Sequence, residues 1–369
     1  MTTKVINGLA LTLLVMAGSW WQAASAAEVT GLYQATVPVD SREDQKQRVR
    51  AFTAGMQEVL VKLTGRIDIA TQPEIQAALR SPQSYAESWA YQTRPDLRTH
   101  EQKLQIDINY YQAGIQRLLD NAGIPLWPQT RPETLVWMII QNEKGEKLLS
   151  DPGAGTGLEE LQALQIQGTR FGLPGHVPLW DLEDQTALTQ DQLWMLDEAA
   201  IRAASSRYQY ESLLAIRLVK LVSGQVMGKS VHIFRDHVHE TEVLEASLDD
   251  FLKATTTMVT KELADNYAVR VSSNKGGTGN ESQLLLLSVE GVNGLTDYAD
   301  VLHYVQSLTG ITEVHVREAR ADTLTFSLNA GGQVRQLVEN LAIDHKLQAV
   351  AKPATEAGNS QLHYRWQSR

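Results

Sequence analysis

The sequence has 369 residues, enough for two or three domains with ordinary cores, and a formal net charge of −10 at pH 7. This acidic balance argues against sequence-independent binding of nucleic acid and against adhesion to anionic lipid, which both need a basic surface. The absence of cysteine excludes disulfides, thiolate metal sites, cysteine nucleophiles and the acylated cysteine of a bacterial lipoprotein.

Residues 1–26 have the pattern of a secretory signal peptide. Lys4 precedes a mostly apolar run over residues 5–17, and the small residues Ala24-Ser25-Ala26 form a cleavage site. The apolar run is shorter than the roughly 18 residues that a membrane span needs. We therefore expect cleavage before Ala27 and a periplasmic location, and an uncleaved anchor is the alternative.

An N-terminal α+β domain is expected over residues 27–128. Its strands are predicted from alternating apolar and polar residues, and its longest helix from an apolar stripe between a capping serine and a terminal glycine. The predicted elements are a strand at 28–37, a helix from Ser41 to Gly65, a helix at 73–79, a strand at 103–110 and a helix at 111–121.

A middle mixed-sheet α/β domain is expected over residues 129–271. Residues 134–140 are continuously apolar or β-favouring and follow Pro132, which is typical of a strand buried on both faces. The order β-α-β-α-β-β-β-α predicts a mixed sheet with helices on its faces. The predicted strands are 134–140, 177–180, 212–222, 226–234 and 238–246, and the predicted helices are 158–168, 191–206 and 248–267.

A flexible linker is expected at residues 272–283, which contain no apolar side chain to bury. Residues 284–369 then follow the order β-α-β-β-α-β of a ferredoxin-like domain. The predicted strands are 284–292, 311–318, 323–329 and 347–351, with an edge strand at 361–367, and the predicted helices are 296–308 and 332–342. The expected fold class is therefore α+β, in three parts.

Four short motifs resemble a known family. They are residues 61–66 (Val-Lys-Leu-Thr-Gly-Arg), 123–127 (Gly-Ile-Pro-Leu-Trp), 131–137 (Arg-Pro-Glu-Thr-Leu-Val-Trp) and 203–208 (Ala-Ala-Ser-Ser-Arg-Tyr). With the signal peptide, they resemble domain-of-unknown-function family twenty sixty-six, exported envelope proteins of diderm bacteria. The resemblance implies an envelope location and no reaction. The middle part is more weakly similar in element order to the TolB N-terminal domain and to CsgG-like domains, which implies a protein-binding role.

The first candidate site is a group of histidines and glutamates: His232, His237, His239, Glu240 and Glu242. If Arg235 and Asp236 form a hairpin turn, His237 and His239 share one face of the second strand. Imidazoles two residues apart on a strand can bind zinc. The alternative is a solvated face of the sheet, because the sequence reveals no residue that would orient the imidazoles.

The second candidate site is the acidic group Asp181, Glu183 and Asp184, which follows a predicted strand. Carboxylates at this edge of an α/β sheet can bind a divalent cation. The alternatives are an exposed acidic loop and a cap for the following helix.

Two further motifs have little functional weight. Residues 151–157 are rich in glycine but lack the ending of a nucleotide-binding loop, so we expect a mobile surface loop. Ser272 and Lys275 match S-x-x-K, but they lie in the expected linker and not on a helix, so we interpret the match as coincidence.

Five tryptophans lie in or near the ends of predicted elements: Trp89, Trp127, Trp137, Trp180 and Trp194. They are expected to seal the seam between the first two domains, and a surface that stacks on sugars or peptides is the alternative.

These observations predict a non-catalytic binding or assembly factor of the cell envelope, exported and soluble, that binds another envelope protein. No catalytic, cofactor-binding or metal-binding residue is assigned, and no cofactor is expected. The alternatives are a metal-dependent hydrolase that uses His237 and His239 or the acidic group, and a carrier of a small envelope ligand in a tryptophan-lined cleft.

Overall fold

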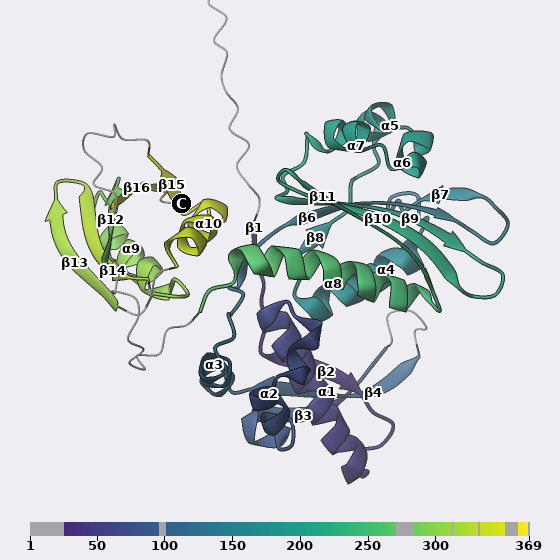
Figure 1. The fold of residues 1–369 in the computed structure, drawn as a ribbon, viewed down its shortest axis with the longest axis horizontal. Coiled ribbons are helices and arrows are strands. Elements are labelled where there is room, and N and C mark those ends of the chain that lie inside the picture. Colours follow the sequence, from purple (N-terminus) through teal and green to yellow (C-terminus); the bar gives the residue numbers. More distant parts are fainter. Residues whose placement is uncertain are drawn as a thin grey trace, which may run out of the picture.

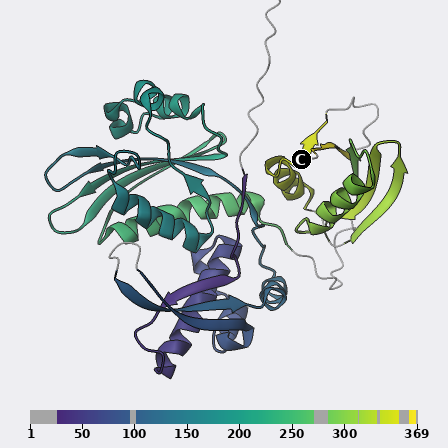
Figure 2. The same cartoon turned by 180° about the vertical axis from the view of Figure 1, so that it is seen from behind.

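The computed structural model describes residues 26–95, 101–270, 284–311, 313–330, 333–350 and 361–367. In these residues, buried apolar side chains gather in four clusters. One cluster lies in the N-terminal part, two lie in the middle part and one lies in the C-terminal part. The ribbon views show the three parts of the chain (Figure 1, Figure 2). The fold is α+β. The linker and the expected signal peptide up to residue 25 lie outside the described residues.

The N-terminal part packs a three-stranded antiparallel sheet, in the order β2-β4-β3, against a long helix. The single strand predicted at 28–37 is wrong, because Gly31 adopts a φ of 69° and the chain turns between β1 and β2. The elements are β1 (Ala26–Glu28), β2 (Gln34–Pro38), α1 (Gln45–Thr64), α2 (Pro73–Ala78), β3 (Ala86–Pro95), β4 (Gln102–Tyr110) and α3 (Gln112–Asn121), with short 3-10 helices η1 (Ile67–Thr71) and η2 (Pro82–Tyr85).

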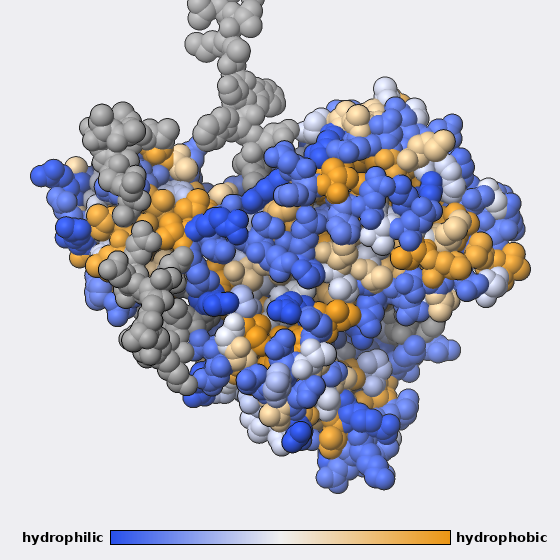
Figure 3. All heavy atoms as spheres, viewed as in Figure 1, coloured by the Kyte–Doolittle hydropathy of each residue, from blue (hydrophilic) through white to orange (hydrophobic). Residues whose placement is uncertain are grey.

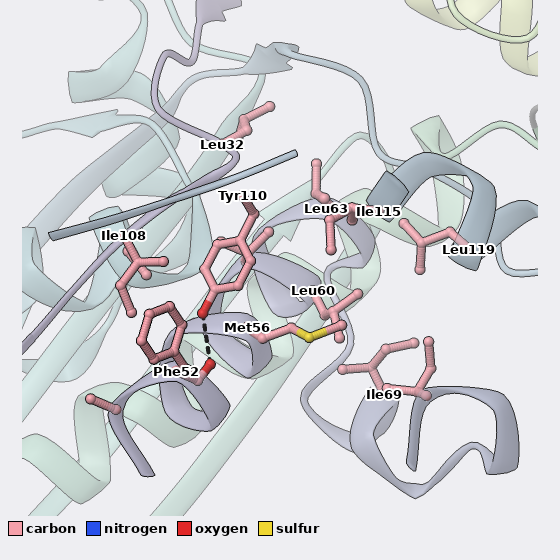
Figure 4. Close-up of a cluster of buried hydrophobic side chains, with 14 of the residues drawn as sticks. Leu32, Phe52, Met56, Leu60, Leu63, Ile69, Ile108, Tyr110, Ile115 and Leu119 are labelled. Atoms are coloured by element: carbon pink, nitrogen blue, oxygen red, sulfur yellow. Dashed lines mark hydrogen bonds between the residues drawn. The ribbon is translucent and has the colours of Figure 1, made fainter. Parts of the chain in front are cut away.

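Helix α1 provides most of the core of the N-terminal part. Its N-cap is Asp44 and not Ser41 as predicted, because the Asp44 side chain accepts a hydrogen bond from the backbone of Gln47. The helix ends at Gly65, as predicted. In the core, the Tyr110 hydroxyl donates a 2.6 Å hydrogen bond to the carbonyl oxygen of Phe52, which joins β4 to α1 (Figure 4).

The middle part is a mixed sheet in the order β11-β10-β9-β6-β7, with β8 also paired to β6. Strands β6 and β9 are parallel, and β9, β10 and β11 form an antiparallel meander. The strands are β5 (Thr130–Pro132), β6 (Thr134–Gln141), β7 (Lys147–Leu149), β8 (Gly175–His176), β9 (Ser212–Lys220), β10 (Val226–Phe234) and β11 (His237–Glu245). The helices are α4 (Leu158–Phe171), α5 (Leu182–Ala187), α6 (Gln190–Met195), α7 (Glu198–Ser205) and α8 (Leu248–Tyr267).

Strand β6 is buried on both faces, as the sequence predicts. Val136, Met138 and Ile140 belong to the cluster beneath α8, whereas Trp137 and Ile139 belong to the cluster covered by α5, α6 and α7. A central strand with helices on both faces explains why its sequence is continuously apolar.

Two predictions for the middle part are wrong. Residues 177–180 do not form a strand, and β8 lies just before them. The helix predicted over 191–206 is two helices, α6 and α7, because Leu196 adopts a left-handed φ of 54° and Asp197 caps the second helix. An uninterrupted apolar pattern can continue across such a break, so periodicity alone does not reveal it.

The C-terminal part has the predicted helices and strands but a different strand order. Its sheet runs β13-β14-β12-β16-β15, and β16 is parallel to β12. The strand predicted at the edge over 361–367 is therefore internal and separates β12 from β15. The elements are β12 (Leu284–Glu290), α9 (Leu295–Ser307), β13 (Glu313–Arg320), β14 (Thr323–Asn329), α10 (Val334–Ile343), β15 (Leu347–Ala349) and β16 (Gln361–Trp366).

Helix α10 joins the C-terminal part to the middle part. The Asn340 amide donates 3.0 Å to the carbonyl oxygen of Tyr267, and Arg235 forms an ion pair with Glu339. The Gln333 side chain both accepts from and donates to the backbone of Arg270. Strand β1 pairs with β5 nearby, and both ribbon views show α10 beside β1 (Figure 1, Figure 2).

The surface is mostly hydrophilic on the face drawn in Figure 3, with apolar residues gathered in a few areas. None of the helices in the described part of the chain is both long and apolar enough to cross a membrane.

Candidate functional site

The predicted hairpin of the histidine group is present, with its turn at Arg235 and Asp236. His232 lies opposite His239 in the register, and Phe234 lies opposite His237. His232 is fully buried, whereas His237 and His239 are exposed. Within the described ranges, no three His, Asp or Glu side chains are arranged to hold a metal ion.

The structure places His232 in a polar network that the sequence did not reveal. Its Nε2 atom lies 2.9 Å from the Ser212 hydroxyl, and its Nδ1 atom lies 2.8 Å from the Glu262 carboxylate. The pKa of His232 is lowered because burial outweighs the effect of Glu262. Strands β9 and β10 and helix α8 supply the three side chains, which are too far apart in the sequence to form a motif.

A serine, a histidine and a carboxylate at these distances resemble a nucleophile, a base and the group that orients it. The Ser212 side chain, however, is fully buried, and its hydroxyl accepts a 3.1 Å hydrogen bond from Thr134. A nucleophile needs an open path to a substrate. The arrangement therefore acts as a closed network that fastens the middle sheet to α8.

The acidic group caps a helix, which is one of the alternatives that the sequence left open. Asp181 is the N-cap of α5 and accepts from the backbone of Asp184. The Arg207 guanidinium lies 2.6 Å from Asp181 and 3.2 Å from Asp184, and it lowers the pKa of Asp181 to about 2. Tyr208 donates 2.5 Å to Asp184. These carboxylate oxygens are thus already bound by donors from the protein.

The glycine-rich loop at 151–157 is folded onto itself. Asp151 and Thr156 exchange backbone hydrogen bonds, and the Asp151 carboxylate accepts from the backbone N–H groups of Gly153 and Ala154. The donors that would bind an anion are therefore partly used by the loop. Ser272 and Lys275 lie outside the described residues.

Of the five tryptophans, Trp127 alone lies between the first two parts, so the predicted seam is wrong for the others. Trp137 and Trp180 stack edge to face at 5.0 Å on the far side of the middle sheet, where Trp194 also packs. Trp89 packs against Phe52 in the N-terminal part and is 45% exposed.

Trp127 stacks on Arg131, a fully buried residue that ties the first two parts together. The Arg131 guanidinium lies 3.9 Å from the Trp127 ring centroid. It donates to the carbonyl oxygens of Lys62 at 2.7 Å and of Gly172 at 2.6 Å, near the C-terminal ends of α1 and α4. Helix C-termini carry partial negative charge and unpaired carbonyls, so they stabilise this cation. Burial nevertheless lowers the pKa of Arg131 to about 9.

Beside Trp127, a cavity of about 660 Å³ lies between the N-terminal and C-terminal parts. This volume is within the range of small-molecule sites, roughly 300 to 1,000 Å³. Its lining includes Leu63, Leu126 and Trp127 of the N-terminal part and Tyr304, Asn340 and Asp344 of the C-terminal part.

Three residues of the lining have buried polar atoms without a hydrogen-bond partner. These atoms are Nε1 of Trp127, the hydroxyl oxygen of Tyr304 and Oδ1 of Asn340. The Trp127 side chain is fully buried and Tyr304 is 5% exposed. Buried polar groups are nearly always paired in folded proteins, but these three atoms are covered by protein atoms, so they lie behind the lining and not at the surface of the cavity.

Asp344 adds an unfavourable charge to the same cavity. It is the C-cap of α10, where the helix dipole disfavours a carboxylate. Its pKa is raised mainly by burial and to a smaller extent by the Glu28 carboxylate, whereas the Tyr304 hydroxyl, Lys346 and His345 act in the opposite direction. The Tyr304 hydroxyl lies near it without forming a hydrogen bond of normal geometry. The next residue, His345, has a φ of 53°, which is rare for a residue with a side chain.

In the comparisons with known proteins, a family model matches the N-terminal part of the chain. Residues 26–128 match the model of a family described as "Domain of unknown function (DUF8605)". No curated protein matches the chain. A solved structure titled "Crystal structure of uncharacterized protein" is similar over 37% of this chain and 97% of its own, at 8% identity and a TM-score of 0.15, which supports no conclusion about fold or function.

Proposed function

We propose that this chain is a non-catalytic binding protein whose small ligand occupies the cavity between the N-terminal and C-terminal parts. The observation that carries the proposal is the cavity of about 660 Å³, which residues of both parts line and whose volume is typical of small-molecule sites. This is the carrier alternative of the sequence analysis, with the cleft lined by one tryptophan.

We also propose that the protein works in the cell envelope, after export and removal of residues 1–26. The signal-like N-terminus and the resemblance to domain-of-unknown-function family twenty sixty-six support this location. The ligand-binding role is compatible with an assembly factor, because a ligand between two parts of a chain can stabilise one arrangement that another envelope protein recognises.

The test is to block the cavity with a side chain from its exposed rim. Ser307 lines the cavity and is exposed, so Ser307→Trp should reduce the space without disturbing a core. Leu295→Trp is the matched control, since Leu295 is 85% exposed at the other end of the same helix and lies outside the cavity lining. Circular dichroism checks that both variants fold.

Ligand-observed NMR with mixtures of small organic compounds is the measurement. We expect the wild type and Leu295→Trp to bind the same compounds, and we expect Ser307→Trp to lose them. If the wild type binds no compound, or if Ser307→Trp binds the same compounds as the wild type, the cavity is not a ligand site.

A further inference from the structure

Strand β3 lies at one edge of the N-terminal sheet, and this edge lacks the usual protection against other strands. Edge strands expose backbone N–H and C=O groups, and folded proteins protect them with charges, proline, bulges or short length. In the part of the chain that the structure describes, the other edge strands are protected: β2 by Pro38, β11 by Glu240 and Glu242, β13 by a bulge between Val316 and Glu318, and β1, β5, β7, β8 and β15 by having no more than three residues.

The central stretch of β3, from Ser88 to Thr93, has none of these devices. It contains no Asp, Glu, Lys, Arg or Pro, and its pairing with β4 continues without a bulge from Ser88 to Pro95. All of its residues are exposed except Tyr91, which is half-buried, and Trp89 is 45% exposed. An open edge of this length is a template to which another strand can add.

Alternate residues of β3 direct their backbone groups outward, and the pairing of the sheet identifies them. The N–H group of Tyr110 donates to the carbonyl oxygen of Tyr33, in register with the β2–β4 pairing, so the even-numbered residues of β4 face β2. The odd-numbered residues of β4 therefore face β3, where Asp107 pairs with Ala90. The backbone groups left on the outer edge, which no other described residue binds, are those of Trp89, Tyr91 and Thr93.

We propose that a second copy of this chain covers this edge, with the two β3 strands antiparallel about a two-fold axis at Tyr91. The open stretch is symmetric about this residue. Ser88 and Arg94 lie three positions to either side of it, one next to a bulge and the other next to a proline. The axis places Tyr91 opposite Tyr91 of the second copy and Trp89 opposite Thr93, so all three outward residues of each strand exchange hydrogen bonds.

The composition of the edge suits pairing with itself. In a two-fold interface each surface meets its own copy, so charges on the edge would lie close to like charges. Residues 88–93 carry no formal charge, and Arg94 is already paired with Asp107 at 2.7 Å. Trp89 and Tyr91 lie edge to face at 5.6 Å, and the pairing brings both beside the same aromatic residues of the second copy. Cross-strand aromatic pairs stabilise sheets.

Thr93→Pro tests the edge, because it removes an outward N–H group and breaks no hydrogen bond to β4. Thr36→Pro is the matched control. Thr36 lies on β2 at the opposite edge of the same sheet, where the odd-numbered residues face β4 and its own N–H group therefore faces outward. Sedimentation equilibrium of the full chain from about 1 μM to 1 mM gives the dissociation constants. We expect the wild type and Thr36→Pro to dimerise, and Thr93→Pro to dimerise about tenfold or more weakly. Circular dichroism checks that both variants fold.

Cysteine crosslinking tests the register independently, since the chain has no cysteine of its own. The proposed pairing places Ala90 opposite Gln92 of the second copy in a non-hydrogen-bonded pair, whose Cα atoms lie about 4.5 Å apart and suit a disulfide. A mixture of Ala90→Cys and Gln92→Cys should therefore form disulfide-linked dimers on mild oxidation. Each variant alone should form far fewer, because its two cysteines are diagonal neighbours about 7 to 8 Å apart.

Three results would contradict the proposal. A wild type that stays monomeric over the whole concentration range excludes a second copy and leaves the edge to an extended segment of another protein. Dimerisation of Thr93→Pro as tight as that of Thr36→Pro places the interface elsewhere on the chain. Equal crosslinking of the mixture and of the single variants excludes the antiparallel register about Tyr91.

Discussion

Nη1 of Arg131 donates a 2.6 Å hydrogen bond to the carbonyl oxygen of Gly172, the residue that ends α4. The same guanidinium donates to the carbonyl oxygen of Lys62 near the end of α1. One buried cation thus satisfies carbonyls of two helices that belong to different parts of the chain. This relationship explains why a charged residue is retained in a site that is otherwise apolar.

Arg131→Met should destabilise the protein by about 3 kcal/mol, because it leaves several buried carbonyl oxygens without donors. The measurement is urea unfolding followed by circular dichroism. Arg170→Met is the control, since Arg170 is mostly exposed and contacts Glu58 at 3.5 Å, and it should change stability by no more than about 0.5 kcal/mol. Equal effects of the two changes would contradict the role given to Arg131.

Gly172→Ala should cost more than Gly123→Ala, although both glycines have a left-handed φ, of 63° and 65°. A Cβ at Gly172 would lie 2.5 Å from Nη1 of Arg131, whereas a Cβ at Gly123 would meet no atom within 4 Å. Backbone strain of about 1 to 2 kcal/mol is common to both variants, and the contact with Arg131 should add about 1 to 3 kcal/mol. Unfolding midpoints that coincide would mean that Arg131 moves aside freely.

Asp344→Asn should raise stability at pH 7 and reduce its dependence on pH. The folded-state pKa of Asp344 is raised above the unfolded value, so the folded chain binds this proton more tightly. Its contribution to stability is present below the unfolded pKa of about 3.8 and is lost as pH rises through the folded pKa. The measurement is denaturant unfolding between about pH 3 and 7, the range in which carboxyl groups titrate. The free energy of unfolding should change less with pH in Asp344→Asn than in the wild type. Asp300→Asn should retain the wild-type profile.

His232→Gln should remove a pH dependence of the opposite sign. The pKa of His232 is lowered from 6.5 in the folded chain, so the unfolded chain binds this proton more tightly. The stability that neutral His232 contributes is present above pH 6.5 and is lost as pH falls through the folded pKa. His303→Gln, at an exposed histidine, is the control. The prediction is wrong if the two variants give parallel profiles of unfolding free energy against pH.

The elements that could be predicted are those whose own residues show an apolar pattern or a turn sequence. Strand β6 is continuously apolar because it is buried on both faces, and Arg235 and Asp236 connect β10 and β11 into a hairpin. Strand β3 was missed because most of its side chains are exposed, so it has no apolar alternation. Its backbone pairing with β4 stabilises it, and single-sequence patterns do not report such pairing.

The candidate site could not be predicted for a related reason. Trp127, Tyr304 and Asn340 meet around one cavity, but Trp127 is 177 residues from Tyr304 and 213 residues from Asn340 in the sequence. The same holds for Ser212, His232 and Glu262, which only the meander and α8 bring together. The sequence shows that Trp127 is large and apolar, but which atoms of it remain unpaired depends on packing between parts of the chain.

The position of β16 has a consequence for synthesis on the ribosome. Because β16 lies between β12 and β15, a growing chain can assemble β12, β14 and β13 as soon as residue 329 has emerged. Strand β15 has no place in the sheet until residues 361–366 follow, since β16 is its hydrogen-bonded neighbour. Until then β12 presents an unpaired edge, which other strands can bind. The sheet therefore stays open while about 37 further residues, from residue 330 to residue 366, are translated. This takes roughly 2 to 7 seconds at ordinary elongation rates.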